Sequence, residues 1–134
     1  MPFAPDWGLP VPWPIHDANL TFLANPNSPS GTVLESAALE RWVAEVAGPV
    51  VLDEAYVDFA QSDALPLLKN RQVIITRTLS KSYALAGIRF GFAIADPALI
   101  RELTKVKDSY NCDVLSLVAA TRSEERRVGK ECRL

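Results

Sequence analysis

The sequence predicts an α/β domain of three layers, in which a mostly parallel β-sheet has helices on both faces. Short apolar runs of strand length alternate along the chain with segments of helical periodicity, and this alternation is typical of parallel sheets buried on both sides. Hydrophobic residues make up 49% of the 134 residues and charged residues 22%, which is enough for a core and excludes a disordered chain. The length indicates one domain or a part of one.

The first half of the chain provides a strand, a turn and a helix. Residues 20–24, LTFLA, form a short apolar run that stops at Asn25-Pro26, and we predict a buried strand there. The turn-forming sequence NPNSPSG follows over residues 25–31. A helix is expected from an N-cap at Ser36 to about Ala47, ended by Gly48-Pro49. Its apolar residues share one helical face: Leu39, Trp42, Val43 and Val46.

Three further apolar runs predict three more strands. Residues 50–52 lead into Asp53-Glu54, residues 73–75 run on into Thr76-Arg77-Thr78, and residues 90–95 read FGFAIA. Because ligands of such sheets bind at the carboxyl ends of the strands, the polar residues that follow each run are the ones to examine.

Two helices complete the prediction. Asp96 is placed to cap a helix that has Pro97 in its first position and runs to about Lys107. We expect its apolar residues to point inward: Leu99, Leu103 and Val106. A last helix is expected over residues 114–120.

Composition excludes several classes of function. The net charge of −2, from 14 basic and 16 acidic residues, offers no electrostatic reason to bind nucleic acid or anionic lipid. His16, Cys112 and Cys132 are too few and too far apart for a zinc site, so no metal is expected. They also argue against a disulfide framework, and we expect a reducing, cytoplasmic setting. The sequence contains no dinucleotide-binding glycine motif and no phosphate-binding P-loop, and a Ser/His hydrolase would have only His16 available.

The two ends of the chain differ from the middle. Residues 1–19 form a proline-rich entry segment, and residues 20–121 form the predicted domain. Residues 122–134, RSEERRVGKECRL, carry five basic and three acidic residues. This stretch is either a solvated charged tail or the translation of a sequencing adapter, which it resembles. We therefore set it aside as a non-native tail in reasoning about function.

Polar residues gather where the predicted strands end. They are Asn25, Asn27, Ser28 and Ser30 after the first strand, Asp53, Glu54 and Tyr56 after the second, and Thr78, Ser80, Lys81 and Arg89 between the third and the fourth. Taken singly, each is more often a cap, a turn residue or a solvated charge. Together they provide hydroxyls and an arginine for a phosphate, a carboxylate for a protonated ring nitrogen, and a lysine. These are the parts that a pyridoxal 5′-phosphate site requires.

Four segments also resemble a known family. TRTLSKSYALAGIRFGF (76–92) is similar to the cofactor-lysine segment of the fold-type I aminotransferases, and within them of the histidinol-phosphate aminotransferases of histidine biosynthesis. ANPNSPSGT (24–32), VVLDEAYVDF (50–59) and KDSYNCDVLS (107–116) match the same family in the same order, so the resemblance covers about residues 20–120. It implies that residues 20–121 are part of the cofactor-binding large domain.

The resemblance assigns roles residue by residue. It makes Lys81 the lysine that attaches the cofactor and later moves the substrate proton. It makes Asp53 the acid that keeps the pyridine nitrogen protonated, and Tyr56 the phenol that hydrogen-bonds the cofactor's 3-oxygen.

The resemblance also assigns the phosphate contacts, and the sequence differs from the family at one position. Thr78, Ser80 and Arg89 match phosphate contacts. The family's usual asparagine directly before the proline of the turn motif is replaced by Ser28, with Asn27 one position earlier. Either of these two residues could provide the contact to the 3-oxygen.

By the same resemblance, we expect amino transfer between glutamate or 2-oxoglutarate and histidinol phosphate or imidazole-acetol phosphate, in a homodimer. A lyase similar to threonine-phosphate decarboxylase is the alternative within this cofactor class. A third possibility is that the chain alone is inert, because relatives also use a glycine-rich phosphate loop, a stacking aromatic residue and a substrate-binding arginine outside these segments. An isolated part of a sheet also exposes apolar surface, and we expect the chain to aggregate.

Overall fold

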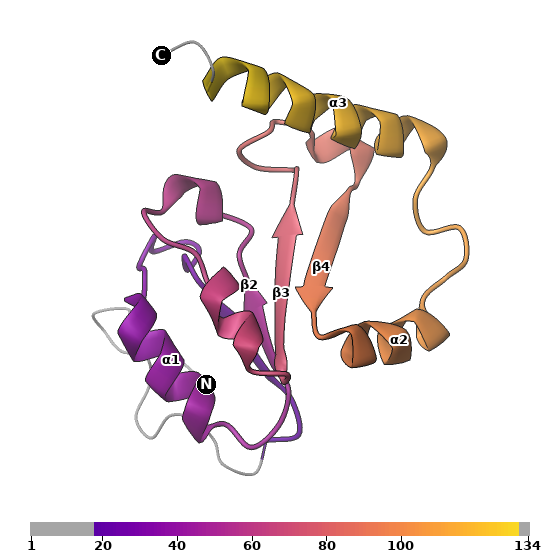
Figure 1. The fold of residues 1–134 in the computed structure, drawn as a ribbon. Helices are drawn as coiled ribbons and strands as arrows, with labels where there is room; N and C mark the ends of the chain where they lie inside the picture. The colour runs from indigo at the N-terminus through magenta and orange to yellow at the C-terminus, as the bar shows by residue number, and fades with distance from the viewer. Residues whose placement is uncertain (1–17, 132–134) are drawn as a thin grey trace.

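The computed structural model describes residues 18–131, and the side chains of residues 18–123, as a four-stranded sheet with helices around it (Figure 1). The strands are β1 (Thr21–Ala24), β2 (Val50–Asp53), β3 (Val73–Thr78) and β4 (Gly91–Ala95), in the spatial order β1-β2-β3-β4. β1, β2 and β3 are parallel, and β4 runs antiparallel to β3. The predicted α/β fold with a mostly parallel sheet is confirmed.

One face of the sheet carries the core. Leu23, Leu52, Ile75 and Ile94 lie side by side across the four strands, and Val50 and Val73 occupy the next row of the same face. Leu52 and Ile75 are completely buried. Because side chains alternate along a strand, the residue after Leu52 points to the opposite face. That residue is Asp53, and the core therefore holds the strand end that carries the candidate site.

Helix α1 (Ser36–Glu45) and the short 3₁₀ helix η2 (Leu65–Lys69) cover this core face. The apolar face of α1 is buried as predicted, through Leu39, Trp42 and Val43. The predicted N-cap is wrong by one residue, since Glu35 occupies that position without a side-chain cap and Ser36 begins the helix. Burial of the apolar face, rather than a cap, therefore stabilises α1.

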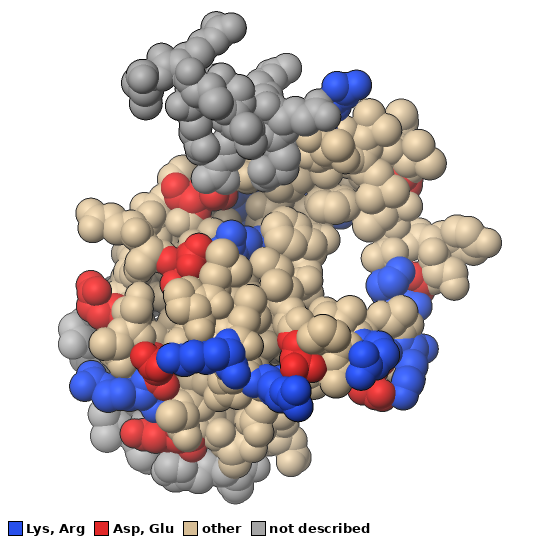
Figure 2. All heavy atoms as spheres, viewed as in Figure 1, with Lys and Arg blue, Asp and Glu red and all other residues tan. Residues whose placement is uncertain are grey.

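Helices α2 (Pro97–Val106) and α3 (Val114–Glu131) lie beyond the two ends of the strands (Figure 1). Asp96 caps α2 as predicted, because its side chain accepts a hydrogen bond of 2.8 Å from the Ala98 amide. The prediction that Leu103 and Val106 point inward is wrong, since their exposed fractions are 42% and 85%. α2 adjoins the sheet only near the end of β4, and Figure 2 shows an open gap beside the connection to α3. The second half of the apolar stripe of α2 is therefore exposed in the described part of the chain.

Some observed features were not predicted, and some predicted ones lie outside the described residues. α3 continues through the predicted tail boundary to Glu131, and the short 3₁₀ helices η1 (Val57–Phe59), η2 and η3 (Ala86–Ile88) were not predicted. His16, Cys132 and most of the predicted entry segment fall outside the described residues.

The described surface is mixed in charge. On the face in Figure 2, basic and acidic side chains alternate instead of forming one basic field. None of the helices within residues 18–131 is both long enough and apolar enough to cross a bilayer.

Candidate functional site

The candidate site lies at the edge of the sheet where the three parallel strands end. Asp53 is the last residue of β2 and its side chain is exposed. Its Oδ1 atom accepts hydrogen bonds from the Ala55 amide at 3.1 Å and from the Thr76 hydroxyl at 3.5 Å. Thr76 is the register partner of Asp53 on β3. The carboxylate is therefore anchored at its base, while it remains accessible at the sheet edge.

Tyr56, Lys81 and Ser28 meet beside this carboxylate, although they follow three different strands. Lys81 Nζ lies 5.0 Å from the centre of the Tyr56 ring. Hydrogen bonds from Lys81 and Ser28 to the phenol lower the pKa of Tyr56 from its ordinary value of 10.0, and the charge of Lys81 adds to this effect. The negative charge of Asp53 opposes it. The four predicted residues Ser28, Asp53, Tyr56 and Lys81 therefore share one electrostatic environment.

The turn after β1 explains why Ser28, and not Asn27, reaches Tyr56. The Asn27 side-chain amide donates to Ser30 Oγ at 2.7 Å, and its backbone amide donates to the Thr32 carbonyl at 2.8 Å. Ser30 Oγ also accepts from the Thr32 hydroxyl at 2.9 Å. Asn25 is occupied in the same way, since its Oδ1 accepts from the Leu34 amide at 2.8 Å. These asparagine side chains close the turn, which leaves Ser28 at its exposed tip.

The segment after β3 carries the predicted phosphate contacts. Thr78 Oγ1 lies 3.0 Å from Ser80 Oγ and accepts from the Ser80 amide at 3.2 Å. Arg89 ends η3, and its guanidinium donates to the Ala86 carbonyl at 3.0 Å. The two hydroxyls form one cluster. No contact within the described residues joins Arg89 to them, so its role at a phosphate stays a prediction.

The loop between Lys81 and Arg89 has an unusual backbone. Ala84 and Arg89 both adopt left-handed conformations, with φ of 54° and 52°. For a residue other than glycine this conformation costs about 1 kcal/mol. The Ala84 amide donates to the Lys81 carbonyl at 3.0 Å, and the Leu85 amide to the Leu79 carbonyl at 3.0 Å. Strained backbone of this kind is common at functional sites.

A second link joins the loops that carry Tyr56 and Lys81. The Ser82 hydroxyl donates a hydrogen bond to Asp58, two residues after Tyr56. Lys81 and Ser82, which are adjacent in one loop, thus contact Tyr56 and Asp58 of the other. The sequence gives no sign of this contact, which joins residues 24 positions apart.

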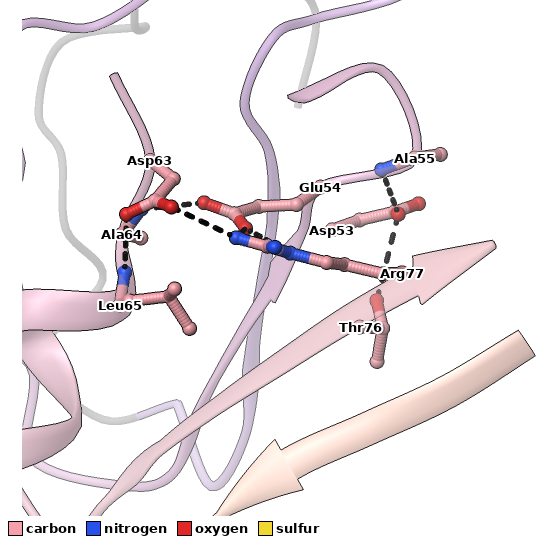
Figure 3. A network of polar contacts seen from close by, with 8 residues as sticks. All are labelled: Asp53, Glu54, Ala55, Asp63, Ala64, Leu65, Thr76 and Arg77. Atoms are coloured by element: carbon pink, nitrogen blue, oxygen red, sulfur yellow. Dashed lines mark hydrogen bonds and ion pairs between the residues drawn. The ribbon is translucent and has the colours of Figure 1, made fainter. Parts of the chain in front are cut away.

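A buried ion-pair network behind the site was also missed. Glu54 is only 2% exposed, and its carboxylate lies 2.7 Å from Nη2 and 2.8 Å from Nε of Arg77 (Figure 3). Arg77 also pairs with Asp63 at 3.2 Å. Burial opposes the charge of Arg77, but hydrogen bonds and attraction from both carboxylates outweigh it and raise the pKa of Arg77. The only sign of this network in the sequence was Arg77 itself, a charged residue close behind the apolar run of residues 73–75.

Helix α3 is tied to the same region through Ser116. The Ser116 hydroxyl is buried and lies 2.8 Å from the Ile88 carbonyl, next to Arg89, and 2.6 Å from Asp113 Oδ2. Hydrogen bonds from the hydroxyl and the backbone amide of Ser116 lower the pKa of Asp113. Cys112, just before this cap, is half-buried.

The donor set fits an organic phosphate cofactor better than a metal. No group of three His, Cys, Asp or Glu side chains is close enough to hold a metal ion in the described part of the chain. Instead, a lysine amine, a phenol, a serine hydroxyl and an accessible carboxylate meet at one strand edge, with two hydroxyls on the adjoining loop. An amine can bind an aldehyde covalently, and a carboxylate can hold a heterocyclic nitrogen protonated.

Known structures share this fold. The chain is similar to the structure of histidinol-phosphate aminotransferase from Sinorhizobium meliloti in complex with pyridoxal-5′-phosphate, with a TM-score of 0.76, 30% identity and coverage of 85% of this chain and 33% of that one. The structure of L-threonine-O-3-phosphate decarboxylase from Porphyromonas gingivalis matches with a TM-score of 0.70 and covers 77% of this chain and 33% of that one. Its identity is 22%, so it shows the fold alone.

Sequence comparison gives closer relatives. Histidinol-phosphate aminotransferase from Rhodopirellula baltica is 49% identical over 124 residues, which are 90% of this chain and 34% of that protein. The enzyme of the same name from Synechocystis is 53% identical over 106 residues, or 78% and 30%. The chain thus spans about a third of the length of the curated relatives it matches. The sequence profile of the aminotransferase class I and II family matches residues 15–125, and the chain belongs to this family.

Proposed function

We propose that this chain is the part of a pyridoxal 5′-phosphate-dependent histidinol-phosphate aminotransferase that carries the cofactor lysine. The observation that supports this most is the meeting of Lys81, Tyr56 and Ser28, which come from the ends of three successive parallel strands. In parallel sheets this edge is where ligands bind. Pyridoxal 5′-phosphate is the cofactor of the family, and the residues present fit it.

Each residue has a chemical task in this proposal. Lys81 would hold the cofactor through its amine, and the same amine would carry a proton to and from the substrate. Asp53 holds the proton on the ring nitrogen, a task that its anchored and accessible carboxylate suits. The bound cofactor supplies an electron sink for the substrate carbanion.

Tyr56 and Ser28 would contact the cofactor's 3-oxygen. Lys81 and Ser28 lower the pKa of the Tyr56 phenol, which makes it a better partner for the 3-oxygen and for the lysine amine. Ser28 replaces the asparagine that the family uses at this position, and it contacts the phenol directly. We therefore assign the contact with the 3-oxygen to Ser28, and we assign to Asn27 the shaping of the turn.

Thr78, Ser80 and Arg89 are proposed to bind the phosphate. The hydroxyls of Thr78 and Ser80 are already 3.0 Å apart, and they lie directly before the lysine. A phosphate needs several donors of this kind, together with a positive charge. Arg89 is the basic residue of the adjoining turn.

The choice of substrate rests on the relatives. Those at 49% and 53% identity are named histidinol-phosphate aminotransferases, whereas the decarboxylase structure is only 22% identical. We therefore propose amino exchange between glutamate or 2-oxoglutarate and histidinol phosphate or imidazole-acetol phosphate. By the same likeness, we propose that the complete enzyme is a cytoplasmic homodimer.

Covalent trapping tests the cofactor assignment. The chain is mixed with an equimolar amount of pyridoxal 5′-phosphate, reduced with borohydride and digested, and the label on each lysine is quantified by mass spectrometry. Lys69, Lys105 and Lys107 serve as internal references, because they pair with neighbours on the surface. We expect at least about tenfold more label on Lys81, as an oriented site reacts faster than an exposed amine. Equal label on all lysines would refute the assignment.

The same assay tests the substrate. Histidinol phosphate added before borohydride is expected to remove label from Lys81, because its amine competes with the lysine for the cofactor. O-phosphothreonine, the compound that the alternative lyase would act on, serves as the comparison. If phosphothreonine removes the label and histidinol phosphate does not, the aminotransferase assignment is wrong.

A further inference from the structure

The buried pair Glu54–Arg77 touches none of the residues assigned to the cofactor, and yet it lies directly behind them (Figure 3). We propose that Glu54 and Arg77 are positioning residues, which fix the end of β2 against the end of β3 and thereby hold Asp53 and Lys81 at their working separation. This inference rests on the proposed function for its cofactor part. Its geometric part can be tested without cofactor.

The Glu54–Arg77 pair, which we call the bridge, also contacts the residues just before η2. Glu54 accepts from Nε and Nη2 of Arg77, and its other oxygen accepts from the Ala64 amide at 2.5 Å. Arg77 makes a further ion pair with Asp63, whose Oδ1 accepts from the amide of Leu65, the first residue of η2, at 3.1 Å. Charge-assisted, two-point contacts of arginine with a carboxylate fix direction as well as distance.

The bridge lies at the last position where β2 and β3 are still paired. The Glu54 amide donates to the Thr76 carbonyl at 2.8 Å, one step beyond the register pair Asp53 and Thr76. Beyond this point β3 has its antiparallel pairing with β4, through Thr78 and Gly91, and then leads into the Lys81 loop. The side-chain bridge therefore replaces backbone pairing where the two strand ends would otherwise separate.

Alternation along the strands places the bridge and the site on opposite faces. Asp53 and Thr76 contact one another on one side, whereas Glu54 and Arg77 meet on the other, as Figure 3 shows. The bridge can therefore act on the cofactor residues only through the backbone. A side chain that acts in this way holds geometry and takes no part in proton transfer.

Substitution of both partners at once can separate a positioning role of the pair from a role in folding. Replacing both partners of such a pair by apolar residues is often neutral for stability, whereas removing one partner leaves a buried charge without compensation. The double variant Glu54→Gln/Arg77→Leu removes both charges of the pair, while the side-chain amide oxygen that replaces the carboxylate can still accept from the Ala64 amide. Lys69→Met is the matched control, because it breaks an exposed ion pair with Glu40 at the last residue of η2, whereas the bridge contacts the residues before η2.

Two measurements are made on the wild type, the double variant, Arg77→Lys and the control. The first is the ultraviolet titration of Tyr56 without cofactor, taken as the difference from the same protein with Tyr56→Phe. The second is the label that borohydride traps on Lys81. If the bridge holds Lys81 near Tyr56, the double variant titrates Tyr56 at higher pH and traps at least about tenfold less label. Arg77→Lys, which keeps the charge, should fall in between, and the control should match the wild type.

The outcomes separate the two proposals. A folded double variant that titrates Tyr56 at the wild-type pH and traps wild-type label overturns the bridge. A wild type without preferential label on Lys81 overturns the proposed function, while a shifted Tyr56 titration in the double variant still supports the bridge. If the double variant does not fold, Glu54→Gln takes its place, since it keeps the shape and removes the charge. Wild-type values in that variant count against the bridge.

Discussion

Truncation of Leu52 to alanine tests whether the core face holds the strand that ends in Asp53. Leu52 is completely buried, and it lies between Leu23 and Ile75 in the sheet register. The change removes three carbon atoms, worth about 2.5 kcal/mol at about 0.8 kcal/mol each. A cavity that closes only in part adds about 1 kcal/mol, so we expect a loss of about 3.5 kcal/mol in the free energy of unfolding.

Urea unfolding followed by far-ultraviolet circular dichroism measures this loss. At an m-value of about 2 kcal/mol per molar urea, the midpoint falls by nearly 2 M, with m unchanged. Phe22→Ala is the matched control, because Phe22 lies on the opposite face of β1 and is 64% exposed. We expect the control to lose less than about 1 kcal/mol. Equal losses in the two variants would show that the core does not lie on the face described above.

Four further predictions concern other parts of the chain. Asp96→Ala removes the cap of α2 and should cost about 1 kcal/mol in urea unfolding, since the Ala98 amide loses its acceptor; an unchanged midpoint would contradict this. Lys81→Met should raise the pKa of Tyr56 toward 10.0 in an ultraviolet titration, because the amine that stabilises the phenolate is gone; a fall would contradict it. The pKa of Asp113 is lowered in the folded chain, so its contribution to stability is present above its ordinary value of 3.8 and is lost as the pH falls through the lowered value. The protection factor of the Ser116 amide, which corrects for the intrinsic pH dependence of exchange, should therefore fall in acid, and Asp113→Asn should lessen that fall; identical protection profiles would speak against the cap. Finally, the large apolar side chains exposed on α2 and α3 should make the isolated chain self-associate with rising concentration in sedimentation velocity, whereas a monomer with a reversible thermal transition would refute this.

The elements that could be predicted from the sequence are those that local pattern controls. The strand at Val50–Asp53 was predicted because an apolar run stops at a carboxylate, and the helix at Pro97–Val106 because Asp96-Pro97 is a cap with its own chemistry. The N-cap of α1 was misplaced by one residue. Ser36 is a good capping residue by type, but in the structure it is the first residue of the helix. The inward face of α2 was wrong because periodicity shows that a helix is amphipathic, but not what covers it.

The candidate site could be predicted only where residue type and order suffice. Lys81, Asp53 and Tyr56 were predicted from their places at strand ends and from the family resemblance. The structure brings them to one edge of the sheet, and their roles there stay predictions. The bridge between Glu54 and Arg77 could not be predicted, because it joins residues 23 positions apart through side-chain geometry. Helical or strand periodicity carries no information about such a pairing.

Two neighbouring acidic residues, Asp53 and Glu54, serve opposite sides of the sheet, and this makes the β2 segment intolerant of changes in length. A single inserted or deleted residue before them would exchange their faces and aim one carboxylate into the apolar interior. The other would then swing away from Arg77 toward the ligand side. Natural variation within Val50–Asp53 should accordingly consist of replacements of similar size, with insertions confined to the loops on either side.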